Sequence, residues 1–458
     1  MSSLELSQPS ASTVELARLV DRITFGVDRT HQEIAESLGY EAYLEWQLDD
    51  EAIDDSDLEA ALQSFLPTLT MSAEELGEYI FEQENFGSAL RDLTIATMIR
   101  QVYSPRQLFE RMVEFWSDHF NAPALSEVAA FFKLLEDRDM MRHRAMGRFG
   151  DLLEADAKSP AMLYYLDNYT NTADGPNENY ARELLELHTL GVDGGYTEED
   201  IKETARIFTG WTIRQPADFY FSPLAHDSGS KSAFGRAFEP AGIAEGEALL
   251  ALLASSEATA RHVVTKMARR FSADLPSRAL VDAGVEAWID SDGDIRVVLR
   301  TLFLHPELRQ QGALKLKRPN EFSAGLLRGL EAELQGNALT AFFESLDTAG
   351  QRPFAWPAPD GYPDRREYWQ STIGFQMRFN AAFAWTREFA EQSAVLQEAA
   401  QIDDLLEQAG FLAAALRPRG LGYDEMRRLL HHGHQVSGAE RPAALAAWLM
   451  ATPEGQWR

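Results

Sequence analysis

The sequence predicts a compact, mainly α protein with one hydrophobic core. Apolar residues recur at helical spacing along most of the chain, as in Val14–Ile23. The alternation typical of half-buried strands is nearly absent, and 45% of the residues are hydrophobic, which is enough to fill a large core. Two long segments, Thr212–Glu245 and Gln351–Asp364, are rich in glycine or proline and are expected to be ordered loops rather than linkers.

The expected elements follow from where apolar residues share one helical face. Helices are predicted, in chain order, at Val14–Ile23, 30–48, 73–102, 105–120, 127–149, 178–190, 198–209, 245–255, 257–272, 277–289, 294–304, 319–334, 373–391, 393–416, 423–432 and 440–450. Trp211–Ile213 and Phe219–Phe221 are the strand candidates, and they would pair as one small β-hairpin. Because no repeat or low-complexity segment divides the chain, we expect a single helical domain over 1–458, with 365–458 as a candidate C-terminal subdomain.

Charge and composition narrow the classes of partner. The chain has 72 acidic and 42 basic residues, a formal charge of −30, so it should repel nucleic-acid phosphates and anionic membranes. It has no cysteine, which excludes disulfides, zinc–thiolate sites and thiol catalysis. No apolar run reaches the length of a membrane span, and Met1–Thr13 lacks the pattern of a signal peptide. These features predict a soluble, cytoplasmic protein with no nucleic-acid partner.

The segment Pro176–Trp211, which begins PNENYARELLELHTLG and ends TGW, is the most distinctive motif. It closely resembles the signature of the bacterial family catalogued as domain of unknown function 1800. The resemblance extends over nearly the whole chain through further motifs at Arg22–Gly26, Phe115–Phe120, Ser159–Asn168, His226–Lys231, Pro359–Pro363 and Thr452–Glu454.

The resemblance implies a fold class but no established activity. Where the family commonly has His-Pro, this chain has Ser256 and Glu257, so no role for that histidine carries over. Family members are often exported, whereas no signal is visible in this chain. They are also often encoded beside a sulfatase-like family, domain of unknown function 1501, which makes a protein of that family a candidate partner.

The polar face of the 178–190 helix is the first candidate site. At about 100° per residue, Glu178, Arg182, Glu183 and Glu186 fall on one arc, with Asn179, and His188 falls on the opposite apolar arc. One interpretation is a solvated face held by ion pairs between residues four apart. The other is a carboxylate cluster that binds a divalent metal or performs acid–base chemistry.

The loop His226–Lys231 is the second candidate element, because it combines an imidazole, a carboxylate and an amine. A turn held by local hydrogen bonds is the alternative. Taken together, the predicted catalytic residues are Glu183, Glu186, Arg182, His226, Asp227 and Lys231, and the predicted metal ligands are Glu178, Glu183, Glu186 and His226. Lys231 would hold an anionic group.

Two histidines are expected to face inward. His119 continues the apolar stripe Leu108–Met112–Phe115, and His188 lies among leucines. A core histidine with a hydrogen bond is the favoured interpretation for each. If the two helix faces meet, His119 and His188 would line one internal pocket.

Other polar clusters have structural explanations. Lys266, Arg269, Arg270, Lys315, Lys317 and Arg318 could form an anion site, but neutralisation of nearby carboxylates is favoured in so acidic a chain. Asp290–Asp294 departs from the calcium-loop pattern and is expected to cap a helix. The segment Trp356–Pro363 would serve as a rigid packed wall or stack against a sugar, and packing is favoured.

These observations lead to two functional hypotheses. The first is a hydrolase-like enzyme, metal-dependent if a divalent cation binds the glutamates, with no other cofactor or small-molecule ligand indicated. The alternative is a non-catalytic binding or assembly protein that acts with a protein partner. Convergence of the Glu183–Glu186 face and the His226–Lys231 loop on one cavity would favour the enzyme.

Overall fold

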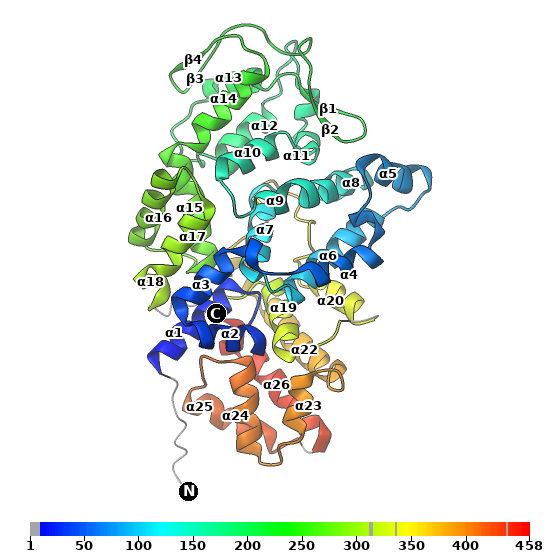
Figure 1. Ribbon diagram of the computed structural model, residues 1–458, viewed down its shortest axis with the longest axis vertical. Helices are drawn as coiled ribbons and strands as arrows, with labels where there is room; N and C mark the ends of the chain where they lie inside the picture. The colour runs from blue at the N-terminus through cyan, green and yellow to red at the C-terminus, as the bar shows by residue number, and fades with distance from the viewer. Residues whose placement is uncertain (1–9, 311–314, 335–336, 437) are drawn as a thin grey trace.

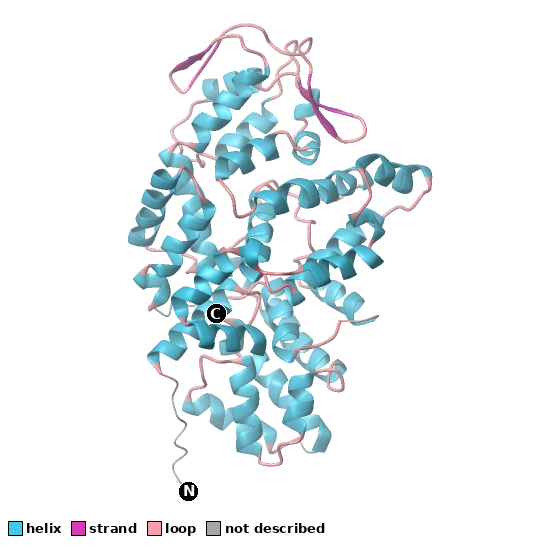
Figure 2. Cartoon of the chain, viewed as in Figure 1, coloured by secondary structure: helices cyan, strands magenta, loops and turns pink. Residues whose placement is uncertain are grey.

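The computed structural model describes residues 10–310, 315–334, 337–436 and 438–458, and it is mainly α-helical (Figures 1 and 2). Of the segment Met1–Thr13, in which no signal peptide was expected, residues 1–9 lie outside the described part of the chain. Within the described ranges, no helix has the length and apolar character needed to span a membrane. The prediction of a mainly α fold is confirmed.

The first half of the chain forms helices around a central helix, α7 (Figure 1). Their bounds are α1 (Ala11–Ile23), α2 (Arg29–Leu38), α3 (Tyr40–Leu48), α4 (Ser56–Phe65), α5 (Ala73–Gly77), α6 (Ser88–Tyr103), α7 (Gln107–His119), α8 (Glu127–Glu136), α9 (Arg142–Arg144), α10 (Phe149–Ala157), α11 (Pro160–Tyr165), α12 (Glu178–Glu183) and α13 (Glu198–Ile207).

Two antiparallel hairpins follow α13 and lie at one end of the molecule (Figure 2). β1 (Trp211–Arg214) pairs with β2 (Asp218–Phe221), with Trp211 opposite Phe221, as the sequence predicted. β3 (Lys231–Ala233) pairs with β4 (Arg236–Phe238) inside the segment that was expected to be an irregular loop. The second hairpin was missed because each of its strands has only three residues, too few for an alternating pattern to be visible.

The second half is again helical. Its bounds are α14 (Ile243–Ala254), α15 (Glu257–Phe271), α16 (Arg278–Ser291), α17 (Ile295–Leu304), α18 (Pro306–Arg309), α19 (Pro319–Leu330), α20 (Asn337–Thr348), α21 (Arg366–Trp369), α22 (Thr372–Glu388), α23 (Ala394–Ala400), α24 (Leu405–Leu416), α25 (Tyr423–Gly433) and α26 (Arg441–Ala451). The helices α22 to α26 gather at the end opposite the hairpins (Figure 1).

Helix boundaries differ from the prediction where the backbone leaves the α conformation. The segment 30–48 is divided at Gly39, whose φ of 78° is the left-handed conformation that favours glycine. The segment 393–416 is divided before Asp404, whose side chain accepts from two amides of α24. The helices α4, α10, α11, α18, α20 and α21 were not predicted; α11, α18 and α21 have only four to six residues, too few to show a helical period.

Among the described residues three short stretches are π-helical, and two of them adjoin the pocket region described below. These two are η4 (Asp137–Met141), which directly continues α8, and η6 (Leu184–His188), which directly continues α12. The helix predicted over 178–190 is therefore α-helical only to Glu183. Single π turns are rare and often lie at functional sites, because the extra residue changes where side chains point.

Helix caps agree with the sequence. Thr197 and Asp200 form the predicted capping box of α13. Asp294 accepts from the Val297 amide and caps α17, which confirms the capping role expected for Asp290–Asp294. A cap leaves a local signature of residue type and spacing, so it can be recognised without tertiary information.

Buried apolar residues of the described chain form one large cluster from α1–α3 to α17, a second one in the C-terminal half and a small third one of Leu62, Leu66, Leu69 and Ala96, so the single core expected from the sequence is divided. The second cluster extends from α19 to α26 and includes Phe25, Met98 and Val102 from the first half. These three residues join the C-terminal helices to the rest of the protein. The expectation of one domain, with 365–458 as a candidate subdomain, stays a prediction.

Candidate functional site

The face of α7 that carries carboxylates is the base of the candidate site. Glu110, Glu114 and Asp118 are spaced four residues apart and therefore share one side of the helix. The apolar stripe on another side is fully buried, with Met112 and Phe115 exposed by 0% and 2%. Burial of that stripe fixes the rotation of α7 and so determines where the carboxylates point.

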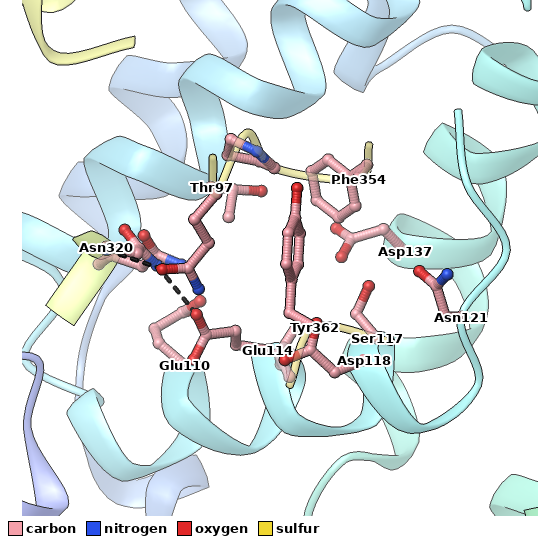
Figure 3. Close-up of a pocket in the computed structure, with 14 residues that line it drawn as sticks. Thr97, Glu110, Glu114, Ser117, Asp118, Asn121, Asp137, Asn320, Phe354 and Tyr362 are labelled. Carbon is pink, nitrogen blue, oxygen red and sulfur yellow. Dashed lines mark hydrogen bonds between the residues drawn. The ribbon is translucent and has the colours of Figure 1, made fainter. Parts of the chain in front are cut away.

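A small pocket of about 50 Å³, partly open to solvent, lies above this face. We call it the α7 pocket. It is lined by Thr97, Gln101, Glu110, Val113, Glu114, Ser117, Asp118, Asn121, Asp137, Asn320, Gln351, Pro353, Phe354 and Tyr362. These residues come from α6, α7, η4, α19 and the loop 351–364. Figure 3 shows them around the ring of Tyr362, with Phe354 and Asp137 on the side opposite Asn320.

Arginines hold the carboxylates of α7 from outside the pocket. Arg270 and Arg318 each donate to both Glu114 and Asp118, at 2.6–3.0 Å. Arg142 donates to both oxygens of Glu110, at 3.0 and 2.6 Å. Three guanidinium groups thus face three carboxylates, and the charges on this side of the pocket balance. The carboxylate oxygens remain available as hydrogen-bond acceptors for an uncharged ligand.

Asp137 differs from the other acids of the pocket. It belongs to the π-helical turn η4, it is 3% exposed, and within the described chain its carboxyl group forms no hydrogen bond or ion pair. Burial raises its pKa above the ordinary value, and this outweighs the opposite influence of Arg142 and Arg100. A buried carboxyl group with a raised pKa can carry a proton near neutral pH and transfer it to a ligand.

The loop 351–364 forms one wall of the pocket and approaches α7 very closely. A Cβ atom on Gly361 would lie 2.0 Å from the carbonyl oxygen of Asp118, and Gly361 has a φ of 72°. Asn121 donates to the carbonyl oxygens of Trp356 and Ala358, at 2.9 and 2.6 Å. The favoured interpretation of Trp356–Pro363 as a packed wall therefore agrees with its contacts.

Phe354, in the same wall, has a φ of 58°. This left-handed conformation is strained for a bulky residue and persists only where surrounding contacts maintain it. The contact here is the amide of Ala124, which donates to the Phe354 carbonyl oxygen at 2.8 Å. Strain of this kind is concentrated at ligand sites.

Behind the end of α7 lies a cluster of buried histidines. The ring centroids of His119 and His188 are 6.1 Å apart, so the two predicted helix faces do meet. His119 donates through Nε2 to the His188 carbonyl oxygen at 3.1 Å, and Lys266 lies 2.8 Å from its Nδ1. His262 contacts the Leu187 carbonyl oxygen in the same manner, at 3.0 Å.

His188 departs from the expectation of a hydrogen-bonded core histidine. It is 0% exposed, and neither ring nitrogen has a hydrogen-bond partner. Burial lowers its pKa to about 3, and the neighbouring Lys266 acts in the same direction. The imidazole therefore stays neutral in the folded protein at physiological pH.

The predicted carboxylate face is largely an ion-pair network on the surface. Arg182 lies 3.3 Å from Glu178, 3.7 Å from Glu186 and 2.9 Å from Glu198, and all four side chains are partly exposed. Pairs of this kind contribute at most about 1 kcal/mol each. The contacts of Glu178, Arg182 and Glu186 thus match the ion-pair interpretation.

Glu183 is the member of that face that approaches the pocket region. It is half-buried, and no ion pair to it is found among the described residues. Burial raises the pKa of Glu183, and the negative charge of Glu186 raises it further. Burial and the negative charges of Glu183 and Asp360 raise the pKa of Tyr165 to about 12. The charge of Asp360, in the 351–364 wall, also raises the pKa of Glu183, so the two carboxyl groups influence one another.

The loop His226–Lys231 forms a separate buried network. His226 lies 2.8 Å from the Thr209 carbonyl oxygen and 3.1 Å from Glu245, which also accepts from Lys231 at 2.6 Å. Asp227 accepts from Arg206 at 2.7 Å. These groups form hydrogen bonds and ion pairs with one another, as expected for a structural turn.

The two predicted parts of the site attach to opposite ends of α13. Glu198, at its first turn, holds Arg182, and Arg206, at its last turn, holds Asp227. These positions are about 12 Å apart along a helix that rises 1.5 Å per residue. Neither Glu186 nor His226 lines the α7 pocket. In the described part of the chain, no group of three or more His, Asp or Glu residues is arranged to hold a metal ion.

The positively charged residues mostly neutralise carboxylates, as favoured from the sequence. Arg270 and Arg318 contact Glu114 and Asp118, Lys315 contacts Asp274, and Lys317 contacts Asp21 at 3.5 Å. Lys266 and Arg269 are different, because Lys266 contacts His119 and Arg269 donates to the Asp274 backbone carbonyl oxygen instead of to a carboxylate.

The α7 pocket was not found from the sequence. The spacing of Glu110, Glu114 and Asp118 was a visible signal, because three acids on one side of an otherwise apolar helix are unusual for a buried element. Asp137 and Tyr362 gave no such signal, since a π turn and a long loop determine where their side chains lie. Only His119 and His188, which lie behind the pocket, had been expected in this region.

Comparison with known proteins identifies one family. A family model described as "Protein of unknown function (DUF1800)" matches residues 18–457. None of the curated proteins and none of the solved structures compared with the chain matches it.

Proposed function

Because the chain belongs to the DUF1800 family, whose description names no activity, we propose its function from its own residues: a hydrolase-type enzyme that binds an uncharged, hydroxyl-bearing small molecule in the α7 pocket. The observation that carries this proposal is Asp137, a carboxyl group of the α7 pocket that is buried and has no partner among the described residues. Its raised pKa suits a group that gives a proton to a leaving group.

The rest of the pocket supports an uncharged substrate. The charges of Glu110, Glu114 and Asp118 are balanced by Arg142, Arg270 and Arg318, so the carboxylates exert little net attraction on a cation. They accept hydrogen bonds from hydroxyl groups or from an attacking water molecule. Asn121 and Gln351 add amide groups of the kind that bind hydroxyls.

Two aromatic rings complete the pocket. The rings of Phe354 and Tyr362 line its interior, and the Tyr362 hydroxyl donates a hydrogen bond to the Arg352 carbonyl oxygen at 2.6 Å. Burial raises the pKa of Tyr362, so its hydroxyl stays protonated. Flat apolar surface beside carboxylates and amides is the combination that binds small polyhydroxylated molecules.

The test is hydrolysis by the purified full chain of a panel of neutral p-nitrophenyl glycosides and esters. The variant is Asp137→Asn, and the matched control is Asp139→Asn, because Asp139 lies on the same π turn with its side chain exposed and paired with Arg138. We expect Asp137→Asn to lower kcat by about 100-fold or more, the usual contribution of a general acid, and Asp139→Asn to leave it unchanged.

The pH profile gives an independent measurement. Since the acid form of Asp137 is the active one, kcat should fall as pH rises through its raised pKa, and that limb should be absent in Asp137→Asn. Equal rates for the two variants would overturn the proposal. The proposal would also be overturned if the protein hydrolyses no compound of the panel and calorimetry detects no binding of neutral sugars.

One observation favours a second candidate function, a binding protein that acts with a partner. Around α21 and the start of α22 the exposed fractions of Tyr368, Ile373 and Phe375 are 63%, 68% and 40%. An apolar groove between α19, α20 and α22, lined on α22 by Met377 and Ala381 among others, adjoins the same helix. Exposed apolar residues grouped beside a groove are typical of a protein interface.

The occupant that we propose for this surface is the candidate partner of the family named domain of unknown function 1501. Purified chains of both families, mixed and separated by size exclusion, should elute together, and Ile373→Asp should abolish the complex. Leu224→Asp, which changes a fully exposed leucine elsewhere, is the control. Separate elution of the wild-type chains would refute this partner.

A further inference from the structure

Lys266 on α15 has surroundings unlike those of the other lysines. The chain has seven lysines, at 133, 158, 202, 231, 266, 315 and 317, and all lie in the described ranges. Six of them have a carboxylate oxygen within 4 Å. No ion pair is found for Lys266, although 72 residues of this chain are acidic.

The partner of Lys266 is an uncharged imidazole. The Lys266 Nζ atom lies 2.8 Å from His119 Nδ1, and His119 Nε2 lies 3.1 Å from the His188 carbonyl oxygen. A carbonyl oxygen accepts only, so Nε2 carries the hydrogen and Nδ1 offers a lone pair. Lys266 is therefore the donor. Burial holds the pKa of His119 well below its ordinary value, so no charge on the ring competes for this lone pair.

Other groups around the amine disfavour a positive charge on it. Arg269 and Arg270 lie on the same helix, and both lower the pKa of Lys266, whereas Asp118 and Asp360 raise it. Burial is the largest influence, and the pKa of Lys266 is lowered to about 8. The imidazoles of His188 and His262 approach from η6 and from the preceding turn of α15, and both are neutral at physiological pH because burial lowers their pKa values.

We propose that Lys266 is a carbonyl-reactive amine whose ligand is a small aldehyde or ketone, a role beyond the hydrolysis proposed for the α7 pocket. The Lys266 residue as a whole is partly exposed on α15, although its amine group lies among buried neighbours. The lone pair of the neutral amine attacks the carbonyl carbon to form the C–N bond, and the carbonyl oxygen leaves as water after taking up both hydrogens of the amine. The product is an imine, and no oxidant or reductant is consumed.

His119 is a positioning residue in this scheme. Its Nδ1 accepts a hydrogen bond from Nζ and so holds the amine in place. The ring itself is fixed from the other side by the His188 carbonyl oxygen. Stacking on Phe115, with ring centroids 6.2 Å apart and nearly parallel planes, keeps the same orientation.

The site can be tested with the wild-type chain by competitive labelling. Glyoxylate is the probe, and cyanoborohydride traps each imine as a stable secondary amine that peptide mass spectrometry assigns to one lysine. Lys202 is the internal control, because its side chain is 56% exposed and lies at a loose 3.7 Å from Glu199. At pH 7 a pKa of about 8 leaves about 9% of Lys266 as free amine, against about 0.04% for an ordinary lysine.

That difference is about 200-fold in free amine, and partial burial reduces it by restricting access. We expect labelling of Lys266 at pH 7 to be at least about 10-fold faster than that of Lys202. Its rate should level off at about pH 9. Lys266→Met should lose the fast-labelled peptide, and Lys202→Met should keep it.

A second variant separates the positioning role from a structural one. His119→Asn keeps an acceptor near the position of Nδ1, so the fast label should stay on Lys266 with an altered pH midpoint. Labelling of wild-type Lys266 no faster than Lys202, or a midpoint above pH 10, would overturn the proposal. Either result would mean that Lys266 is an ordinary ammonium group that serves only as a hydrogen-bond donor to His119.

Discussion

Replacement of Gly361 by alanine tests the contact that closes the α7 pocket. A Cβ at this position would lie 2.0 Å from the Asp118 carbonyl oxygen and 2.7 Å from its carbonyl carbon, and both atoms are backbone, so neither can rotate away. Relief requires the 351–364 wall to move off α7. Forcing an extra carbon into a packed contact costs about 1–3 kcal/mol.

The φ of 72° at Gly361 adds a second cost, because the left-handed conformation destabilises alanine by about 1–2 kcal/mol. The total expected for Gly361→Ala is therefore about 2–5 kcal/mol. Gly350 provides a matched control in the turn that precedes the same loop. Its φ is 77°, but a Cβ there would meet no atom within 4 Å. Gly350→Ala should then cost only the conformational part, about 1–2 kcal/mol.

Equilibrium unfolding in urea, followed by tryptophan fluorescence, measures both variants. The difference between them, about 1–3 kcal/mol, isolates the close approach of the loop to Asp118, since the effect of alanine on the unfolded chain cancels. The Gly361→Ala protein should also show weaker hydrolysis if the α7 pocket is the active site. Equal losses of stability in the two variants would refute the argument that Gly361 is required for this contact.

Three further predictions concern buried ionisable side chains. Glu321→Gln should destabilise the fold by about 3–5 kcal/mol, because Arg111 and Arg458 donate to this buried carboxylate at 2.7 and 2.8 Å. Arg182→Gln on the surface should cost less than about 1 kcal/mol, and similar urea midpoints for the two variants would contradict this prediction. His188→Leu should raise the free energy of unfolding by about 1–3 kcal/mol, because two ring nitrogens without a partner among the described residues are removed from the core. A lower free energy of unfolding would show that the imidazole binds a group of its own. Burial lowers the pKa values of His31 and His262 to about 4, so the unfolded chain takes up protons that the folded chain does not. The stability contributed by these neutral rings should be lost as pH falls from about 6.5 to 4, and His31→Phe should make the urea midpoint less sensitive to acid over this interval.

The local part of this architecture was predictable from the sequence. Helical periodicity located most of the long helices, and the caps at Thr197 and Asp294 were recognised from residue type and spacing. The hairpin at Trp211 was also expected. The pairing of Arg182 with Glu178 and Glu186 was one of two interpretations considered, because residues four apart meet on any helix.

The candidate site was predicted less well, for a physical reason that its residues illustrate. Asp118 and Gly361 are in contact but lie more than two hundred positions apart in the sequence, and no local pattern encodes such a pair. The hypothesis that Glu186 and His226 bind one metal ion had the same weakness, because it assumed that two polar segments meet. In the structure α13 separates them.

What the sequence determined by itself was the class of fold, the polar and apolar sides of helices such as α7, and the family resemblance, because these depend on residue type and short spacing. The tertiary structure decided which of the 72 acidic residues became a pocket. It did so through the burial of α7, the π turn that turns Asp137 inward and the close approach of the 351–364 wall. Burial is a property of the packed chain, and it also sets the pKa values of Asp137 and Lys266 that underlie both proposals.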